Sequence, residues 1–310
     1  MKVSLVGYTG FVGSNLYASA GSELDAVYNS GNIEEAFGTC PDLLIYAGLR
    51  AEKYLANHAP EKDMELICQA EDNLTKINPK RLVLISTIDV FKVPEKVDET
   101  SKIDQEGLQP YGYNRYQLEL WVRDYFSNSL IIRLPGLFGK NLKKNFIYDY
   151  LNLIPSMLTE AKFRELEEKD ASLKQYYWAQ NNGFYRVNAA AENYESLKVI
   201  FTSLGFSAMN FTDSRSIYQY YDLSWLWDDI HRALRAGIKL WHPATEPVSA
   251  GEIYKYLTGK DFINELDGKP AHYDYRSIYA EVFGGRNGYI CSRETVLKGI
   301  KEFAETCKKK

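Results

Sequence analysis

The chain has 310 residues, of which 45% are hydrophobic and 25% are charged, which suits one large or two modest domains with a well-packed core. Its 37 basic and 41 acidic side chains give a formal net charge of -4. The only basic block is the terminal KKK, so the composition argues against a nucleic acid partner.

Strand-like and helix-like segments alternate over the first 135 or so residues. Short apolar runs predict strands buried on both faces at 2–7, 24–29, 42–48, 81–86 and 130–136. Helical periodicity predicts helices at 11–20, 32–38, 60–77 and 113–126. Such alternation favours a doubly wound parallel sheet with right-handed crossovers, of the Rossmann type.

A glycine-rich loop, GYTGFVG, follows the first expected strand and precedes the first expected helix. Gly7, Gly10 and Gly13 let the backbone turn sharply and come close to a pyrophosphate, whose charge the helix N-terminus favours. The position after a strand and before a helix is the one that a dinucleotide-binding loop requires. The loop therefore predicts NAD or NADP binding.

The end of the second strand does not choose between these two cofactors. An acidic side chain there usually binds a free ribose 2′-hydroxyl, whereas this chain has VYNSGN, with Asn29 and Ser30. The stretch has no arginine or lysine for a 2′-phosphate either, so NAD and NADP both stay open.

The composition changes after residue 139, where the chain becomes polar, aromatic and helix-rich up to about residue 240. We expect a dinucleotide-binding domain over residues 1–138 and a smaller, mostly helical substrate-binding region over 139–310. The apolar stretch at 238–244 can return as a strand to the first sheet.

Cysteine and histidine spacing bears on metals and location. The cysteines lie far apart, and none of the histidines is spaced with cysteines or acids as metal ligands are. The start MKVSLVGYTG runs into a strand without a signal-peptide pattern, and no apolar run reaches the ~18 residues that span a bilayer. We expect a cytoplasmic protein with reduced thiols, no metal and no membrane partner.

Four motifs occur in an order typical of one enzyme family: GYTGFVG (7–13), LISTIDVF (84–91), YGYNR (111–115) and IIRLPGLFG (131–139). Together they resemble the extended short-chain dehydrogenase/reductase family, which contains nucleotide-sugar epimerases, dehydratases and reductases. The likeness is close over the first 140 residues and looser beyond them. It implies NAD or NADP as cofactor and a nucleotide sugar as substrate.

The resemblance implies that Thr87, Tyr111 and Arg115 are the catalytic residues. Tyr111 takes the place of the acid/base, and Thr87 that of the hydroxyl that binds the reacting oxygen. A tyrosine pKa near ~10 must fall by ~3 units for such work at neutral pH, which a cation one helical turn away assists. The family usually has lysine there; Arg115 can tune Tyr111 and hold the ribose but hardly releases a proton.

The resemblance also implies the binding residues. The expected cofactor contacts are Gly7, Thr9, Gly10, Phe11, Val12, Gly13, Asn29, Ser30, Ala47, Gly48, Arg50, Ser86 and Pro135. The expected substrate contacts are Asp89, Asn145 and Arg215, the last because a guanidinium binds a diphosphate through paired hydrogen bonds.

The resemblance bears on three enzyme activities, namely dehydration, reduction and epimerisation, and on one non-catalytic alternative. Dehydratases of the family carry an Asp-Glu pair after the threonine, where this chain has Ile88 and Asp89, so dehydration is disfavoured. A 4-keto-sugar reductase is slightly favoured over an epimerase, either of them in a pathway such as surface polysaccharide synthesis. The alternative is a non-catalytic NAD(P)-binding regulator or scaffold. By analogy, helices near 60–77 and 111–127 pair two copies into a homodimer.

Overall fold

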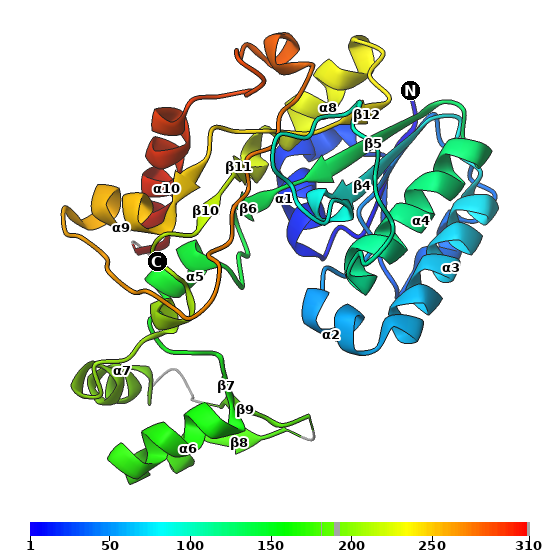
Figure 1. Ribbon diagram of the computed structural model, residues 1–310. Helices are drawn as coiled ribbons and strands as arrows, with labels where there is room; N and C mark the ends of the chain where they lie inside the picture. The colour runs from blue at the N-terminus through cyan, green and yellow to red at the C-terminus, as the bar shows by residue number, and fades with distance from the viewer. Residues whose placement is uncertain (181, 189–192, 309–310) are drawn as a thin grey trace. The chain divides into compact units, whose positions relative to one another are not determined.

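The computed structural model describes residues 1–180, 182–188 and 193–308 (Figure 1). The chain forms two compact units. Unit 1 contains Met1–Leu142, Ile217–Val248 and His272–Ile300, and unit 2 contains Lys143–Ser216, Ser249–Ala271 and Lys301–Lys310. The domain division differs from the one expected after residue 138, because two segments of the later half of the chain pack with the first half.

Unit 1 is built on a six-stranded parallel sheet with the order β12-β5-β4-β3-β1-β2. Its strands are β1 (Val3–Val6), β2 (Ala26–Tyr28), β3 (Leu43–Tyr46), β4 (Leu82–Thr87), β5 (Ser129–Leu134) and β12 (Leu240–Trp241). The five expected strands and the Rossmann-type sheet are confirmed. β12 pairs with β5, Leu240 opposite Ile131, so the stretch at 238–244 does return to the sheet.

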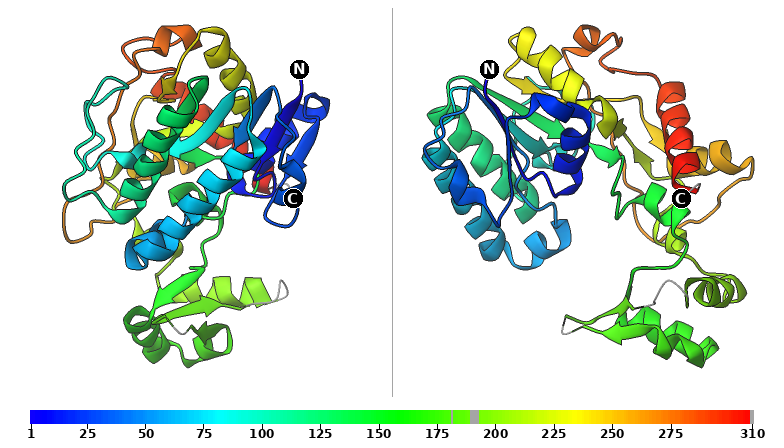
Figure 2. Two further views of the ribbon diagram at one scale, coloured as in Figure 1. Left: turned by 90° about the vertical axis from the view of Figure 1, so that its right-hand side faces the viewer. Right: turned by 180° about the vertical axis from the view of Figure 1, so that it is seen from behind.

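Helices cover both faces of this sheet (Figures 1 and 2). One face packs on α1 (Phe11–Ala20) and α8 (Leu226–Arg235), and the other on α3 (Pro60–Ile77) and α4 (Pro110–Tyr125). Because successive strand residues point to opposite faces, each strand contributes to both cores, which explains its continuous apolar sequence. The short α2 (Lys53–His58) packs against α3 and α4.

The helix expected over 32–38 is instead a short 3₁₀ turn, η2 (Ile33–Ala36). Gly38, with φ at +70°, follows it, and the Gly38 N–H donates to the carbonyl of Lys76. The run is therefore too short to propagate an α-helix.

Smaller elements complete unit 1. β6 (Gly136–Phe138) pairs in parallel with β11 (Tyr220–Asp222), and β10 (Ile217–Tyr218) pairs with β13 (Val248–Ser249). The other 3₁₀ turns are η1 (Gly21–Glu23), η3 (Ile88–Val90), η7 (Leu223–Trp225) and η8 (Ala280–Phe283). The last helix, α10 (Arg293–Lys308), begins in unit 1 and continues into unit 2 after Ile300.

Unit 2 is helix-rich, as expected, but it also contains an antiparallel sheet that the sequence did not suggest. That sheet has the order β7-β9-β8, from β7 (Met157–Thr159), β8 (Tyr177–Ala179) and β9 (Phe184–Val187). Phe163, Tyr177 and Phe201 share its buried core. The other elements are α5 (Phe146–Leu151), α6 (Glu160–Lys169), η4 (Ala171–Gln175), α7 (Tyr194–Ser203), η6 (Ala208–Phe211) and α9 (Ala250–Thr258).

A buried ionic cluster ties α4 to the sheet. Glu119 of α4 is fully buried and accepts hydrogen bonds from Nε and Nη2 of Arg133 on β5, the shorter at 2.6 Å. It also pairs with Arg123 of the same helix at 3.2 Å, and the Arg123 side chain is 40% exposed.

No helix in the part of the chain that the structure describes is long and apolar enough to cross a membrane.

Replacing either arginine tests how much burial decides the value of these ion pairs. Arg133→Met leaves the Glu119 carboxylate buried without its main partner, so we expect the free energy of unfolding to fall by about 3–5 kcal/mol. Arg123→Met is the matched control at the same carboxylate, and its loss should stay below about 1 kcal/mol because water screens the pair. Urea denaturation measures both; equal losses would contradict the assignment.

Candidate active site

The glycine-rich loop between β1 and α1 is tightly packed backbone. A Cβ atom on Gly7, whose φ is +91°, would lie 2.3 Å from the carbonyl oxygen of Ala47, and one on Gly13 would lie 2.0 Å from that of Gly7. Only glycine fits these two positions. Gly10 is the N-cap of α1, and within the described residues no side chain caps this helix. The N–H groups of the first helical turn, which include those of Phe11 and Val12, therefore suit a pyrophosphate.

The loop after β2 is held by its own amides. The Asn29 N–H donates to Oδ1 of Asn32 at 2.8 Å, and Oδ1 of Asn29 accepts from the N–H of Gly31 at 2.7 Å. The Asn29 carboxamide oxygen is thus used within the turn, with Ser30 exposed beside it. This geometry again leaves both NAD and NADP open.

The segment after β3 lies against the glycine loop. The Ala47 N–H donates to the carbonyl of Val6 at 2.9 Å, and a Cβ on Gly48 would lie 3.0 Å from Cγ1 of Val6. Arg50 is exposed, and its carbonyl oxygen accepts from Nη2 of Arg115 at 2.7 Å. Thr9 is exposed in the loop itself, and Pro135 directly follows β5. The cofactor roles of these residues stay predictions.

Thr87 and Tyr111 come together at the carboxyl end of β4. Thr87 is the last residue of that strand, and its side chain lowers the pKa of the neighbouring Tyr111 phenol. Gly112 lets α4 approach closely, because a Cβ there would lie 2.0 Å from the Asp89 carbonyl oxygen in η3. Asn57 of α2 accepts the Tyr111 N–H at 2.9 Å. The sequence analysis assigns both residues to one reacting oxygen, and their catalytic roles stay predictions.

Ser86, the neighbour of Thr87, faces elsewhere. Its hydroxyl donates to Oε1 of Glu119 at 2.6 Å, inside the buried cluster of α4 and β5. Since the Ser86 hydroxyl is committed there, Thr87 is the better of the two candidates for binding a reacting oxygen. The cofactor contact expected of Ser86 has no support from this geometry.

Arg115 is engaged by a carboxylate that the sequence analysis did not single out. Its Nη1 and Nη2 atoms donate to Asp63 of α3 at 2.7 and 3.0 Å, and both side chains are less than a tenth exposed. The Arg115 guanidinium also lies 4.7 Å from the centre of the Tyr111 ring. A signal for Asp63 was present: it occupies the apolar face of the 60–77 helix with Ile67 and Leu74, where a charge needs a partner.

The environment of Tyr111 opposes its ionisation in the protein alone. Burial raises the pKa of the Tyr111 phenol, while the Arg115 charge and the Thr87 hydrogen bond lower it and the Asp89 and Asp63 charges raise it. The net effect is a raised pKa for the Tyr111 phenol. Arg115 therefore contributes the expected lowering, but burial outweighs it.

Asp89 has two side-chain partners. Its Oδ2 atom lies 3.0 Å from Nζ of Lys53 on α2, and its Oδ1 atom accepts from the Tyr273 hydroxyl at 3.1 Å. Neither Lys53 nor Tyr273 was recognised from the sequence, because residues this far apart in the chain leave no local pattern. The substrate contact expected of Asp89 stays a prediction.

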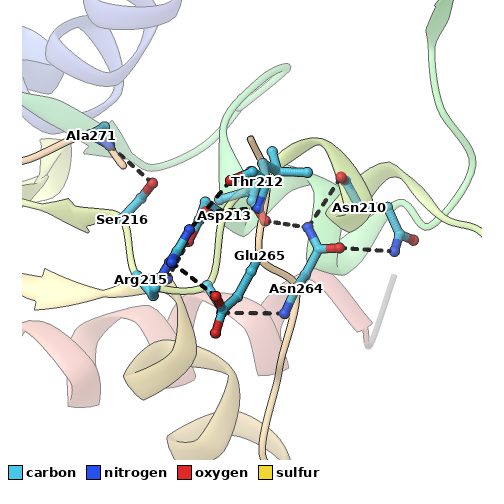
Figure 3. Close-up of polar contacts among 10 residues, drawn as sticks. Asn210, Thr212, Asp213, Arg215, Ser216, Asn264, Glu265 and Ala271 are labelled. Carbon is cyan, nitrogen blue, oxygen red and sulfur yellow. Dashed lines mark hydrogen bonds and ion pairs between the residues drawn. The ribbon is translucent and has the colours of Figure 1, made fainter. Parts of the chain in front are cut away.

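The two remaining expected substrate contacts lie in unit 2. Arg215 donates from Nη2 to Asp213 at 2.7 Å and from Nη1 to Glu265 at 2.9 Å (Figure 3). The side-chain hydrogen bond from Arg215 holds the pKa of Asp213 well below its usual range. Asn145 caps α5, its Oδ1 accepting the N–H groups of Ile147 and Tyr148. Arg215 is therefore already bound to carboxylates, and both substrate roles stay untested.

No set of three His, Cys, Asp or Glu side chains that could hold a metal ion occurs in residues 1–180, 182–188 and 193–308.

Comparison with known proteins gave matches only in structure: no family model matches the chain, and no curated protein matches its sequence.

Solved structures match the whole chain. A dTDP-4-dehydrorhamnose reductase from Clostridium acetobutylicum is 12% identical over 99% of this chain and 100% of that one, with a TM-score of 0.63. The reductase of that name from Bacillus anthracis, solved with NADP, is 16% identical over 99% of each chain, with a TM-score of 0.63. A UDP-glucose 4-epimerase from Thermus thermophilus, solved with NAD, is 12% identical over 99% of each, with a TM-score of 0.61.

At these identities the matches show the fold. The chain has the fold of the sugar-nucleotide reductases and epimerases that its motifs resemble, which confirms the fold implied by the resemblance.

A carboxyl group near the Asn145 cap makes stability depend on pH. Burial raises the pKa of Asp149 to about 7 from its ordinary 3.8. The folded chain therefore keeps a proton that the unfolded chain loses, so the free energy of unfolding falls as the pH rises from about 4 to about 7. Asp149→Asn removes this loss, and we expect the variant to be more stable than the parent at pH 8 but not at pH 4.

Denaturant melts at both pH values measure this difference. Asp170→Asn is the comparison, since hydrogen bonds from Ser172 lower the pKa of that carboxyl and its replacement should not stabilise the chain at pH 8. A gain from Asp149→Asn that is the same at both pH values would refute the proposed burial effect.

Proposed function

We propose that this chain is an NAD(P)-dependent oxidoreductase or epimerase acting on a nucleotide-activated sugar. The observation that carries the proposal is that Thr87 ends β4 where the start of α4, with Tyr111, packs against Asp89 of η3. In a doubly wound sheet, ligands bind at the carboxyl ends of the strands, and the glycine loop leaves β1 at that same edge. The activities of the matched structures, and the NADP or NAD bound in two of them, support this assignment.

The glycine loop fits a dinucleotide. Gly7 and Gly13 leave no room for a side chain, and the N-terminus of α1 is open to a phosphate charge among the described residues. We assign the cofactor site to this loop, with Asn29 and Ser30 beside the adenosine ribose. A bound nicotinamide supplies or accepts the hydride.

The roles of the side chains follow from their positions. In the reducing direction the Tyr111 hydroxyl gives its proton to the carbonyl oxygen as the carbonyl carbon receives the hydride, and in oxidation the proton returns to Tyr111. Thr87 donates a hydrogen bond that orients the reacting oxygen. Arg115 is held in place by its ion pair with Asp63. Its positive charge beside the ring lowers the pKa of Tyr111.

The reaction is a reduction or an epimerisation. Elimination of water needs a second acid/base next to the threonine, and Ile88 occupies that place, while the Asp89 carboxylate is paired with Lys53. We also propose that the protein is a cytoplasmic homodimer, formed through α3 and α4, that serves polysaccharide synthesis. A monomer mass in light scattering would contradict the dimer.

A non-catalytic NAD(P)-binding protein is the second candidate, and one observation favours it. Arg115 stands where the family has lysine, and its guanidinium is bound by Asp63 in a buried pair. A sensor or scaffold needs neither Thr87 nor Tyr111, and both are present. Mass spectrometry of the dinucleotide released on denaturation, followed by NAD(P)H oxidation assays with dTDP-4-keto sugars and by assays for conversion of UDP-glucose to UDP-galactose, separates the two functions.

Substitution of Tyr111 tests the catalytic proposal. Tyr111→Phe removes the proton donor while keeping the ring, so we expect turnover to fall by about 10²–10⁴-fold. The affinity for the dinucleotide should change little because the glycine loop is intact. Steady-state kinetics and cofactor titration measure the two effects.

Tyr113→Phe is the matched control for this substitution, since Tyr113 lies on the same helix and is 39% exposed. It should leave turnover unchanged. Parental activity in Tyr111→Phe would exclude Tyr111 as the acid/base.

A further inference from the structure

Lys53 connects α2 with the site through Asp89. Its ammonium lies 3.0 Å from Oδ2 of Asp89, and Asn57, one helical turn later, accepts the Tyr111 N–H. Residues four apart lie on one face of a helix, so the same face of α2 contacts both the Asp89 carboxylate and the start of α4. α2 therefore positions the Lys53 cation beside Asp89, one of the charged residues that act on Tyr111.

Three charged residues act on Tyr111: Arg115 on α4 itself, Asp63 on α3 and Asp89 in η3. Lys53 of α2 pairs with the last of these. The neutral partners are Thr87 and, through Asp89, the Tyr273 hydroxyl. The Arg115 charge is matched by Asp63, which leaves Asp89 as the carboxylate that needs a counterion next to the phenol.

We propose that Lys53 is a positioning residue of the active site: it pairs with Asp89 and so cancels a negative charge that would otherwise oppose proton release by Tyr111. This inference rests on the proposed function, in which Tyr111 exchanges a proton with substrate. Lys53 takes, from another helix and through a carboxylate, part of the electrostatic role that a lysine at position 115 would have.

Titration of Tyr111 tests the inference without any substrate. Tyrosine labelled with ¹³C at Cζ gives one resonance that disappears in Tyr111→Phe, and its chemical shift reports ionisation of that phenol. In Lys53→Met we expect the resonance to titrate at higher pH by about 0.5–1 unit, because an uncancelled carboxylate disfavours the tyrosinate. Lys53→Arg should restore the parental curve.

A double variant shows whether Lys53 acts through Asp89. In Lys53→Met with Asp89→Asn, no carboxylate remains to be cancelled, so the upward displacement should disappear. Lys80→Met is the matched control, since Lys80 forms a similar ion pair with Asp42 at 2.8 Å before β4, at the other end of the strands. It should leave the Tyr111 titration unchanged, and thermal melts show whether each variant is folded.

Each outcome has one meaning. An unchanged curve in Lys53→Met, an equal displacement in Lys80→Met, or a displacement that persists in the double variant would each overturn the role of Lys53. If Lys53→Met titrates as expected while the parent turns over no nucleotide sugar, the electrostatic pairing stands and the proposed function fails. In an active parent, the basic limb of the pH–rate profile should move with the resonance.

Discussion

The buried ion pair between Arg115 and Asp63 is the interaction on which the site depends. It joins α3 to α4 beside Tyr111. Both oxygens of the Asp63 carboxylate accept hydrogen bonds from the Arg115 guanidinium. Breaking such a pair would leave a charge buried without a partner, which costs several kcal/mol. The pair thus fixes the ring of Tyr111 from one side, and it also commits the cation of α4 to a structural contact.

The other side of Tyr111 is fixed by backbone rather than by charge. Gly112 brings α4 within van der Waals contact of the Asp89 carbonyl, and Thr87 ends β4 at that point. The parallel order of β4, β3 and β1 then sets the glycine loop at the same edge of the sheet. Thr87, the start of α4 and the glycine loop thus lie at the same edge of the sheet, although they are far apart in the sequence.

Sequence reasoning could predict what local pattern controls. The apolar runs predicted the first five strands of the main sheet but not β6, and the motifs assigned Thr87 and Tyr111 to one reacting oxygen, which stays a prediction. It could not predict that Ser86 binds Glu119 or that Arg115 binds Asp63, because these partners are chosen by packing across helices. The sheet of unit 2 was missed for another reason, since strands as short as β7 have too few residues to show a period of two.

The balance of charges around Tyr111 bears on the direction of the proposed chemistry. Two cations, Arg115 and Lys53, face two carboxylates, Asp63 and Asp89, so the near charges largely cancel and burial decides. Burial keeps the phenol protonated, since a buried tyrosinate lacks solvation. A protonated phenol is the form that donates to a carbonyl oxygen, whereas an epimerase must first remove a proton from an alcohol. A raised Tyr111 pKa therefore suits the step in which the phenol donates its proton, which a reductase and an epimerase share.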